Sequence, residues 1–155
     1  MNTLKLKLTI LFSTACFLQA VNAQKMRDLK QEEANKKFVT EFFYTFYNEK
    51  NMDKARTMML PDMINHHPHS GKGAEETIAA VNKFLFGKFP EFTVSIKRIA
   101  AEGDLVWIQC YTQDTPKDHG KMSMDIFRVK NGKIAEHWDI IQEIPLTVDP
   151  SSMFN

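Results

Sequence analysis

Residues 124–139 read Met-Asp-Ile-Phe-Arg-Val-Lys-Asn-Gly-Lys-Ile-Ala-Glu-His-Trp-Asp, and this stretch decides the fold. Polar and apolar residues alternate on both sides of Asn131-Gly132, as in two strands joined by a tight turn. Asn and Gly accept the positive φ angles of a two-residue turn, so Lys130 pairs with Lys133. The sequence therefore predicts an antiparallel hairpin.

Counting back from this turn places Asp125 opposite Trp138 and diagonal to His137 and Asp139. Ionisable side chains then gather on one patch of an otherwise apolar sheet. Alternation along the strands predicts two shared faces, formed by Ser123, Asp125, Phe127 and Val129 in the first strand and by Ala135, His137, Asp139 and Ile141 in the second.

The N-terminus has the pattern of a secretory signal peptide. Lys5 and Lys7 precede an apolar run at residues 8–18, which is too short to span a bilayer. Small residues before Gln24 favour cleavage after Ala23. We therefore expect a leader at residues 1–23 and a secreted or periplasmic protein, with one domain at residues 24–146 and a weakly ordered C-terminal tail at residues 147–155.

A lipoprotein anchor at Cys16 fits less well, because Ser13 stands where a branched apolar residue is expected. After cleavage only Cys110 remains, which excludes an intramolecular disulfide. Cys110 follows Val106 and Ile108 at strand spacing, so we expect a buried thiol.

Charge argues against nucleic acid as a partner. Loss of the two leader lysines leaves 18 basic against 19 acidic residues, a net charge of −1 with neutral histidines. Basic residues form no stripe of the kind that binds a phosphate backbone. Beyond the leader no segment is long enough for a membrane span, so no membrane partner is expected after cleavage.

The remaining periodicity predicts helices first and strands afterwards. This order indicates an α+β fold, with helices packed on one face of a curved, mainly antiparallel meander. The expected helices are residues 31–47, 51–60 (stopped by Pro61) and 74–86, and the expected strands are residues 92–100, 105–112, 121–129 and 133–144.

Asp139 is the leading candidate for chemistry. If its face lines an apolar cavity, desolvation raises the pKa of its carboxyl toward the range that suits a general acid or base. An ion pair with Arg128 or Lys121 at the sheet rim is the structural alternative. Asp125 can likewise be a catalytic carboxyl or part of a structural ion pair. His137 can hydrogen-bond to either carboxylate, as an orienting group or as a proton partner.

Three histidines, His66, His67 and His69, form a second cluster. A metal site is disfavoured, because Pro68 breaks any helix and adjacent histidines of an extended segment point to opposite sides. We expect one imidazole to point inward beside a pocket. An aromatic wall can line the same pocket, although aromatic residues at such spacing usually belong to the core. Its candidate residues are Phe43, Tyr44, Tyr47, Trp107, Tyr111 and Trp138, of which Tyr44, Trp107 and Trp138 are the expected substrate contacts.

Two blocks resemble the SnoaL-like polyketide cyclase family of the nuclear transport factor 2-like superfamily. Residues 63–68, Met-Ile-Asn-His-His-Pro, resemble an extended family segment, and the hairpin ending in His137-Trp138-Asp139 resembles a family hallmark. The resemblance covers about residues 33–144. It implies a cone-shaped α+β barrel whose bent sheet wraps around a pocket closed by the N-terminal helices.

The resemblance also implies site residues. The aspartate matching Asp139 is the general acid/base of an aldol ring closure that uses neither metal nor organic cofactor. His66 matches a pocket-lining position, and Asp125 falls where family members carry an ionisable partner. Met63 and His67 depart from the common family residues, and a leader does not fit the cyclisation of polyketides made in the cytosol.

Two functional hypotheses follow. In one, Asp139 moves a proton next to a carbonyl of a small apolar or carbonyl-containing molecule, assisted by His137, Asp125 and His66, without metal or cofactor. In the other, the domain binds a small ligand or dimerises without catalysis, since fold alone does not decide function. A homodimer is compatible with both.

Overall fold

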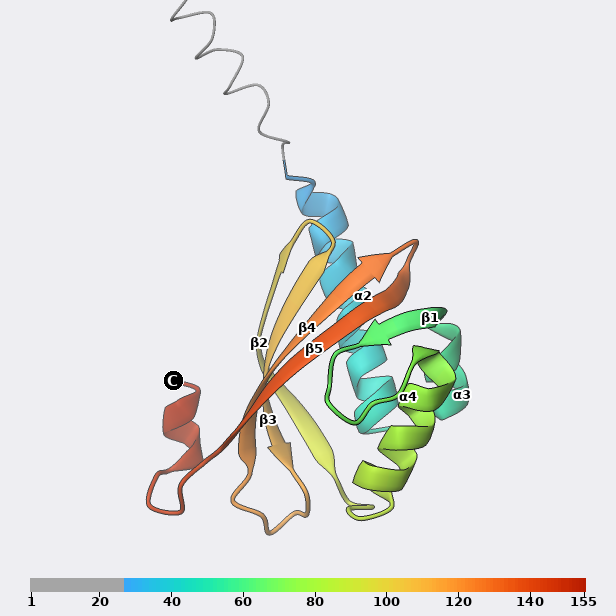
Figure 1. The fold of residues 1–155 in the computed structure, drawn as a ribbon. Coiled ribbons are helices and arrows are strands. Elements are labelled where there is room, and N and C mark those ends of the chain that lie inside the picture. Colours follow the sequence, from blue (N-terminus) through green and yellow to red (C-terminus); the bar gives the residue numbers. More distant parts are fainter. Residues whose placement is uncertain (1–26) are drawn as a thin grey trace, which may run out of the picture.

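A five-stranded mixed sheet frames the molecule (Figure 1). The computed structural model describes residues 27–155, so the leader expected at residues 1–23 lies outside the described residues. The strands are β1 (Met59–Asn65), β2 (Thr93–Glu102), β3 (Leu105–Gln113), β4 (Lys121–Lys130) and β5 (Lys133–Glu143), in the order β1-β5-β4-β3-β2. The predicted α+β class and antiparallel meander from β2 to β5 are confirmed. The edge strands β1 and β2 do not pair with each other, so the cone-shaped sheet does not close into the expected barrel.

Strand β1 corrects the expected second helix at residues 51–60. Helix α3 (Met52–Thr57) is shorter, and the chain enters β1 at Met59 and pairs in parallel with β5. Pro61 lies inside β1, which is an edge strand, where a missing backbone N–H is tolerated. This parallel pairing joins segments more than 70 residues apart, so local periodicity did not reveal it.

The other helices agree with the sequence. Helix α2 (Leu29–Tyr47) starts where the Asp28 side chain accepts a hydrogen bond from the N–H of Gln31, 3.0 Å away. Helix α4 (Gly73–Val81) continues as a π-helix, η1 (Asn82–Phe86). Figure 1 shows α2 running along the sheet and α3 and α4 beside the β1 edge. Within residues 27–155 no helix is both long and apolar enough to cross a membrane.

The core lies between α2 and the concave sheet face. Phe42 and Phe43 meet Phe127 of β4 edge-on, with ring centroids 5.7 and 6.0 Å apart. Val106, Ile108 and Cys110 of β3 are fully buried beneath them. Cys110 is a buried free thiol, as expected, and burial raises its pKa.

A β-bulge corrects the predicted register of the decisive hairpin. Lys130 pairs with Lys133 as expected, but Ala135 is an extra residue, so Asp125 lies opposite Asp139 instead of Trp138. Residues directly opposite each other in an antiparallel pair share a face. The regular register would have put Trp138 on the face of Asp125, and the bulge puts Asp139 there. It also makes Ile134, not Ala135, the inward residue at that end of β5.

The C-terminal tail, expected to be weakly ordered, packs on the sheet. It contains a short 3₁₀ helix, η2 (Pro150–Met153), and Phe154 contacts Tyr111 edge-on at 5.7 Å. His119 Nε2 lies 3.0 and 2.9 Å from the carbonyl oxygens of Pro145 and Val148. These contacts hold the tail beside the loop between β3 and β4.

Candidate active site

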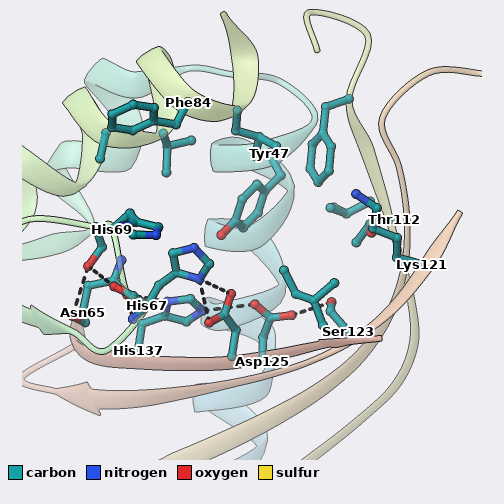
Figure 2. Close-up of a pocket in the computed structure, with 18 of the residues that line it drawn as sticks. Tyr47, Asn65, His67, His69, Phe84, Thr112, Lys121, Ser123, Asp125 and His137 are labelled. Atoms are coloured by element: carbon teal, nitrogen blue, oxygen red, sulfur yellow. Dashed lines mark hydrogen bonds and ion pairs between the residues drawn. The ribbon is translucent and has the colours of Figure 1, made fainter. Parts of the chain in front are cut away.

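A cavity of about 230 Å³ lies between the concave sheet face, the end of α2 and the α4–η1 segment. Its walls are mostly apolar, and its polar groups gather on the sheet side (Figure 2). The lining residues from the helices and β2 include Phe43, Tyr47, Val81, Phe84, Leu85 and Val94, and those from the sheet and the segment after β1 include Asn65, His67, His69, Lys121, Ser123, Asp125, His137, Asp139 and Ile141.

His67 and Asp139 form a close pair in this cavity. The Nδ1 atom of His67 lies 2.9 Å from both carboxylate oxygens of Asp139. An ionised carboxylate only accepts hydrogen bonds, so Nδ1 carries the proton. Among the described residues the other ring nitrogen, Nε2, has no hydrogen-bond partner, and Figure 2 shows the His67 ring projecting into the open cavity. A carboxylate on Nδ1 and a free Nε2 are the geometry of a histidine general base.

The pair shifts the pKa values of both groups. Burial raises the pKa of the Asp139 carboxyl, but the hydrogen bond from His67 and the charges of His137 and His67 outweigh it, and the pKa lies below its ordinary value. The expected upward shift of Asp139 is therefore wrong. The same hydrogen bond raises the pKa of His67 by more than burial lowers it. The raised pKa makes the neutral ring of His67 a stronger base than an ordinary imidazole.

Asp125 and His137 form a second pair, directly behind the first. His137 Nε2 lies 3.0 Å from Asp125 Oδ1, and Ser123 donates its hydroxyl to Asp125 Oδ2 at 2.8 Å. Both residues are only 5% exposed. The His137 ring stacks on Phe127 with centroids 4.6 Å apart, which fixes its plane.

Asn65 determines the tautomer of His137. Its Oδ1 atom accepts the backbone N–H of His67 at 3.0 Å, which identifies that atom as the amide oxygen. The same oxygen lies 3.1 Å from His137 Nδ1, so Nδ1 must be a donor. One further proton is then shared between His137 Nε2 and Asp125, and the pair is neutral overall whichever of the two holds it.

The structure thus brings Asp125, His137 and Asp139 together on the cavity face. All three were candidates from the sequence, and their catalytic roles stay predictions. Asp139 is bound by His67 and not by Arg128 or Lys121, the partners of the structural alternative. Arg128 pairs instead with Glu136 and Asp104, and Lys121 with Asp114.

His66, expected in the pocket, lies on the opposite side of the sheet. It stacks on Trp138 with ring centroids 4.7 Å apart, and its Nε2 atom is 3.3 Å from Glu136. The backbone N–H of His66 donates to the backbone carbonyl oxygen of His137, which extends the β1–β5 pairing by one residue. Alternation along this extended segment points Asn65 and His67 inward and His66 outward.

The expectation that Tyr44, Trp107 and Trp138 line the pocket is also wrong, since none of them lines the cavity. Trp107 and Trp138 alternate with buried inward residues of β3 and β5, so both lie on the outer face, in register with Ile126. The Tyr44 hydroxyl accepts the backbone N–H of Ile96 at 3.4 Å. Tyr47, one helical turn later, lines the cavity instead.

Asp125, His137 and Asp139 also offer ligand atoms within 4.8 Å of one another, which is close enough to hold a metal ion. In the structure Asp125 and His137 bind each other, and Asp139 binds His67. A metal ion would have to displace these contacts. The prediction that the site uses no metal and no cofactor stays a prediction.

His67, Asn65 and Tyr47 line the cavity but were not selected as site residues from the sequence. Strand parity links the first two, because an inward Asn65 places His67 inward and His66 outward, and the β1–β5 pairing shows that Asn65 is inward. Tyr47 ends a helix whose other aromatic residues are core, and nothing in the spacing distinguishes it from them.

The family model of the SnoaL-like polyketide cyclases matches residues 37–149. The chain belongs to this family. No curated protein matches the chain.

Solved structures of proposed polyketide cyclases and of an epoxide hydrolase share the fold. IdmH from Streptomyces antibioticus, a proposed polyketide cyclase, is 22% identical with a TM-score of 0.60, over 69% of this chain and 91% of its own. A proposed SnoaL-like polyketide cyclase from Jannaschia is 24% identical with a TM-score of 0.61, over 77% and 91%. An LEH-like epoxide hydrolase from M. tuberculosis is 19% identical with a TM-score of 0.60, over 80% and 91%. At these identities the likeness shows the fold, and the site must be argued from this chain's own residues.

Proposed function

We propose that this domain catalyses proton transfer next to the carbonyl group of a small molecule, without metal or organic cofactor. The reaction class is an aldol-type cyclisation, an isomerisation or a dehydration. The observation that carries the proposal is the His67–Asp139 pair, which presents an unoccupied imidazole nitrogen to a largely apolar cavity.

His67 Nε2 is the base in this scheme. It takes a proton from the carbon beside the carbonyl, the C–H electron pair forms a C=C bond, and the carbonyl π electrons move onto oxygen. The resulting imidazolium is stabilised by Asp139, as in other histidine–carboxylate pairs. It then returns the proton to another carbon, or to the alkoxide formed when the enolate attacks a second carbonyl.

Asp139 keeps a central part in this scheme, although a different one from that expected. Its lowered pKa makes it a weak base, and both its oxygens already accept from His67. It therefore orients His67 and raises its basicity. The buried Asp125–His137 pair behind it is neutral overall, so it does not oppose the negative charge of Asp139.

Deuterium exchange tests the proposal without knowledge of the natural substrate. Small β-dicarbonyl compounds and cyclic ketones are incubated in D₂O with the protein, and exchange beside the carbonyl is followed by proton NMR. Wild type should accelerate exchange of at least one compound over buffer. His67→Gln and Asp139→Asn should lose that acceleration by roughly 100-fold or more, the usual contribution of a general base.

His66→Gln is the matched control, because it alters the neighbouring imidazole on the outer face. It should retain wild-type exchange. Absence of acceleration by wild type across the panel, or equal rates for H67Q and wild type, would contradict the proposal.

A non-catalytic ligand-binding module is the second candidate. The lowered pKa of Asp139 favours it, because a group tuned away from neutrality suits binding better than proton abstraction. Tight binding of an unreacted ligand, with no exchange in the panel, would establish this function instead.

Export and a homodimer belong to the proposal as well. In an exported protein the partner molecule would be met outside the cytosol, which separates this chain from cyclases that act on newly made polyketides.

A further inference from the structure

The Tyr47 hydroxyl lies in the cavity wall, and the proposed proton transfer leaves it without a role. Among residues 27–155 it has no hydrogen-bond partner, in contrast to Tyr44, which binds the backbone of Ile96, and Tyr111, which donates to the carbonyl of His119 at 3.0 Å. Figure 2 shows the Tyr47 hydroxyl oxygen pointing into the cavity, on the side where His67 lies.

Aromatic neighbours fix the position of the Tyr47 ring. Phe43 and Phe46 contact it edge-on at 4.9 and 5.0 Å, and Phe92 lies at 6.0 Å. The hydroxyl is therefore held in place before any ligand arrives. Donors held in this way stabilise developing negative charge most effectively, because they do not have to reorganise during the reaction.

The surroundings also keep this hydroxyl protonated. Burial, together with the negative charges of Asp125 and Asp139, raises the pKa of Tyr47 well above the ordinary tyrosine value. At neutral pH the group is thus a hydrogen-bond donor. It enters from α2, across the cavity from the sheet that carries Asp139.

We propose that Tyr47 is a catalytic residue, whose hydroxyl donates a hydrogen bond to the carbonyl oxygen of the substrate and stabilises the enolate oxygen. This inference rests on the proposed function. In this arrangement Tyr47 recognises the carbonyl oxygen and His67 removes the proton. The substrate then lies with its carbonyl toward α2 and its acidic carbon toward His67.

Binding of 4-nitrophenol against nitrobenzene tests this role without turnover. The two probes share a ring and a nitro group, and only 4-nitrophenol supplies an oxygen anion comparable to an enolate. Wild type should bind 4-nitrophenol, as its phenolate, more tightly than nitrobenzene. Tyr47→Phe should weaken phenolate binding by roughly tenfold to a hundredfold, the worth of one hydrogen bond to a charged acceptor, and leave nitrobenzene binding unchanged.

Tyr44→Phe is the control, since it removes a hydroxyl from the same helix outside the cavity. Equal phenolate binding by Y47F and wild type, an equal loss in Y44F, or no preference of wild type for the phenolate would each overturn the inference. Fluorine NMR of wild type labelled with 3-fluorotyrosine at its three tyrosines gives a readout that needs no variant. The Tyr47 resonance should shift on phenolate addition, and an unmoved resonance would equally overturn the inference.

The two proposals fail separately. Phenolate binding that depends on Tyr47, in a protein without deuterium exchange, would remove the reaction and leave Tyr47 as a ligand-binding residue. Exchange that depends on His67 but proceeds equally in Y47F would remove this inference alone.

Discussion

At the scale of single residues, the site depends on which imidazole pairs with Asp139. The candidate acids and His137 could be found from the sequence, because ionisable residues in an apolar hairpin stand out. His67 could not be separated from His66 by composition, and the family resemblance favoured His66. Alternate residues of an extended segment point to opposite faces, and this decides between His66 and His67. Which face each one takes is known only once β1 is seen to pair with β5 as far as Asn65.

The proton-transfer role of His67 predicts a specific pH profile. The neutral ring is the base, so exchange should rise with pH through the raised pKa of His67 and level off above it. In Asp139→Asn the midpoint should move to lower pH, because burial alone lowers the pKa of His67. Rates measured from acid to mildly alkaline pH check this. A rate that stays flat through neutrality would make Asp139 the base.

Gly120 gives a residue-level prediction for stability. Its φ is +85°, and a Cβ atom there would lie 2.2 Å from the Tyr111 ring, which is anchored through its hydroxyl. Gly120→Ala should destabilise the fold by about 2 kcal/mol through combined strain and overlap. Urea denaturation measures the loss.

Gly103→Ala is the matched control, because Gly103 has a φ of +61° and open space around it. It should cost only about 1 kcal/mol, the backbone penalty without the overlap. Equal losses in the two variants would show that packing against Tyr111 contributes nothing.

At the scale of elements, the helices and the four meander strands follow from periodicity, because each pattern is local. Two features do not. Strand β1 forms by pairing with a segment far along the chain, and its Pro61 reads locally as a helix stop. The bulge at Ala135 has no signature in the spacing, and yet it turns Asp139 toward Asp125. The chemistry of the site thus depends on one irregularity of the sheet.

Glu32 ties α2 to the β2–β3 turn and predicts a stability change in acid. Its carboxylate bonds to Arg27 and accepts the Gly103 N–H at 2.9 Å, and these contacts lower its pKa from 4.5 to about 2. A lowered folded pKa stabilises the fold above pH 4.5, and this contribution disappears as pH falls toward 2.

Glu32→Gln should therefore be less stable than wild type at neutral pH, and the gap should close toward pH 2. Chemical denaturation at a series of pH values measures the gap. A constant gap across that range would show that ionisation of Glu32 does not stabilise the helix contact.

At the scale of the whole molecule, the family and the cone-shaped α+β architecture were predictable from two short motifs. The presence of a cavity follows from that architecture, whereas the identity of its ligand does not. Its volume of about 230 Å³ limits the partner to a small molecule. Neither the volume nor the lining selects one carbonyl compound.

The leader expected from the sequence predicts how the mature protein begins. Expressed from Met1 in a host that exports proteins, the chain should be cleaved after Ala23 and start at Gln24, which leaves 132 of the 155 residues. Intact-mass spectrometry of the exported fraction measures this. A mass that retains Met1, or one that begins with a lipid-modified Cys16, would contradict it.

The central claim is that Asp139 holds His67 as a base with its free nitrogen in the cavity. A pH titration of the His67 ring nitrogens by NMR, in wild type and in Asp139→Asn, tests it most directly. We predict a wild-type pKa above 6.5, a proton on Nδ1 in the neutral ring, and a lower pKa in the variant. A neutral ring protonated on Nε2, or a pKa of His67 that is the same with and without the carboxylate, would contradict the claim.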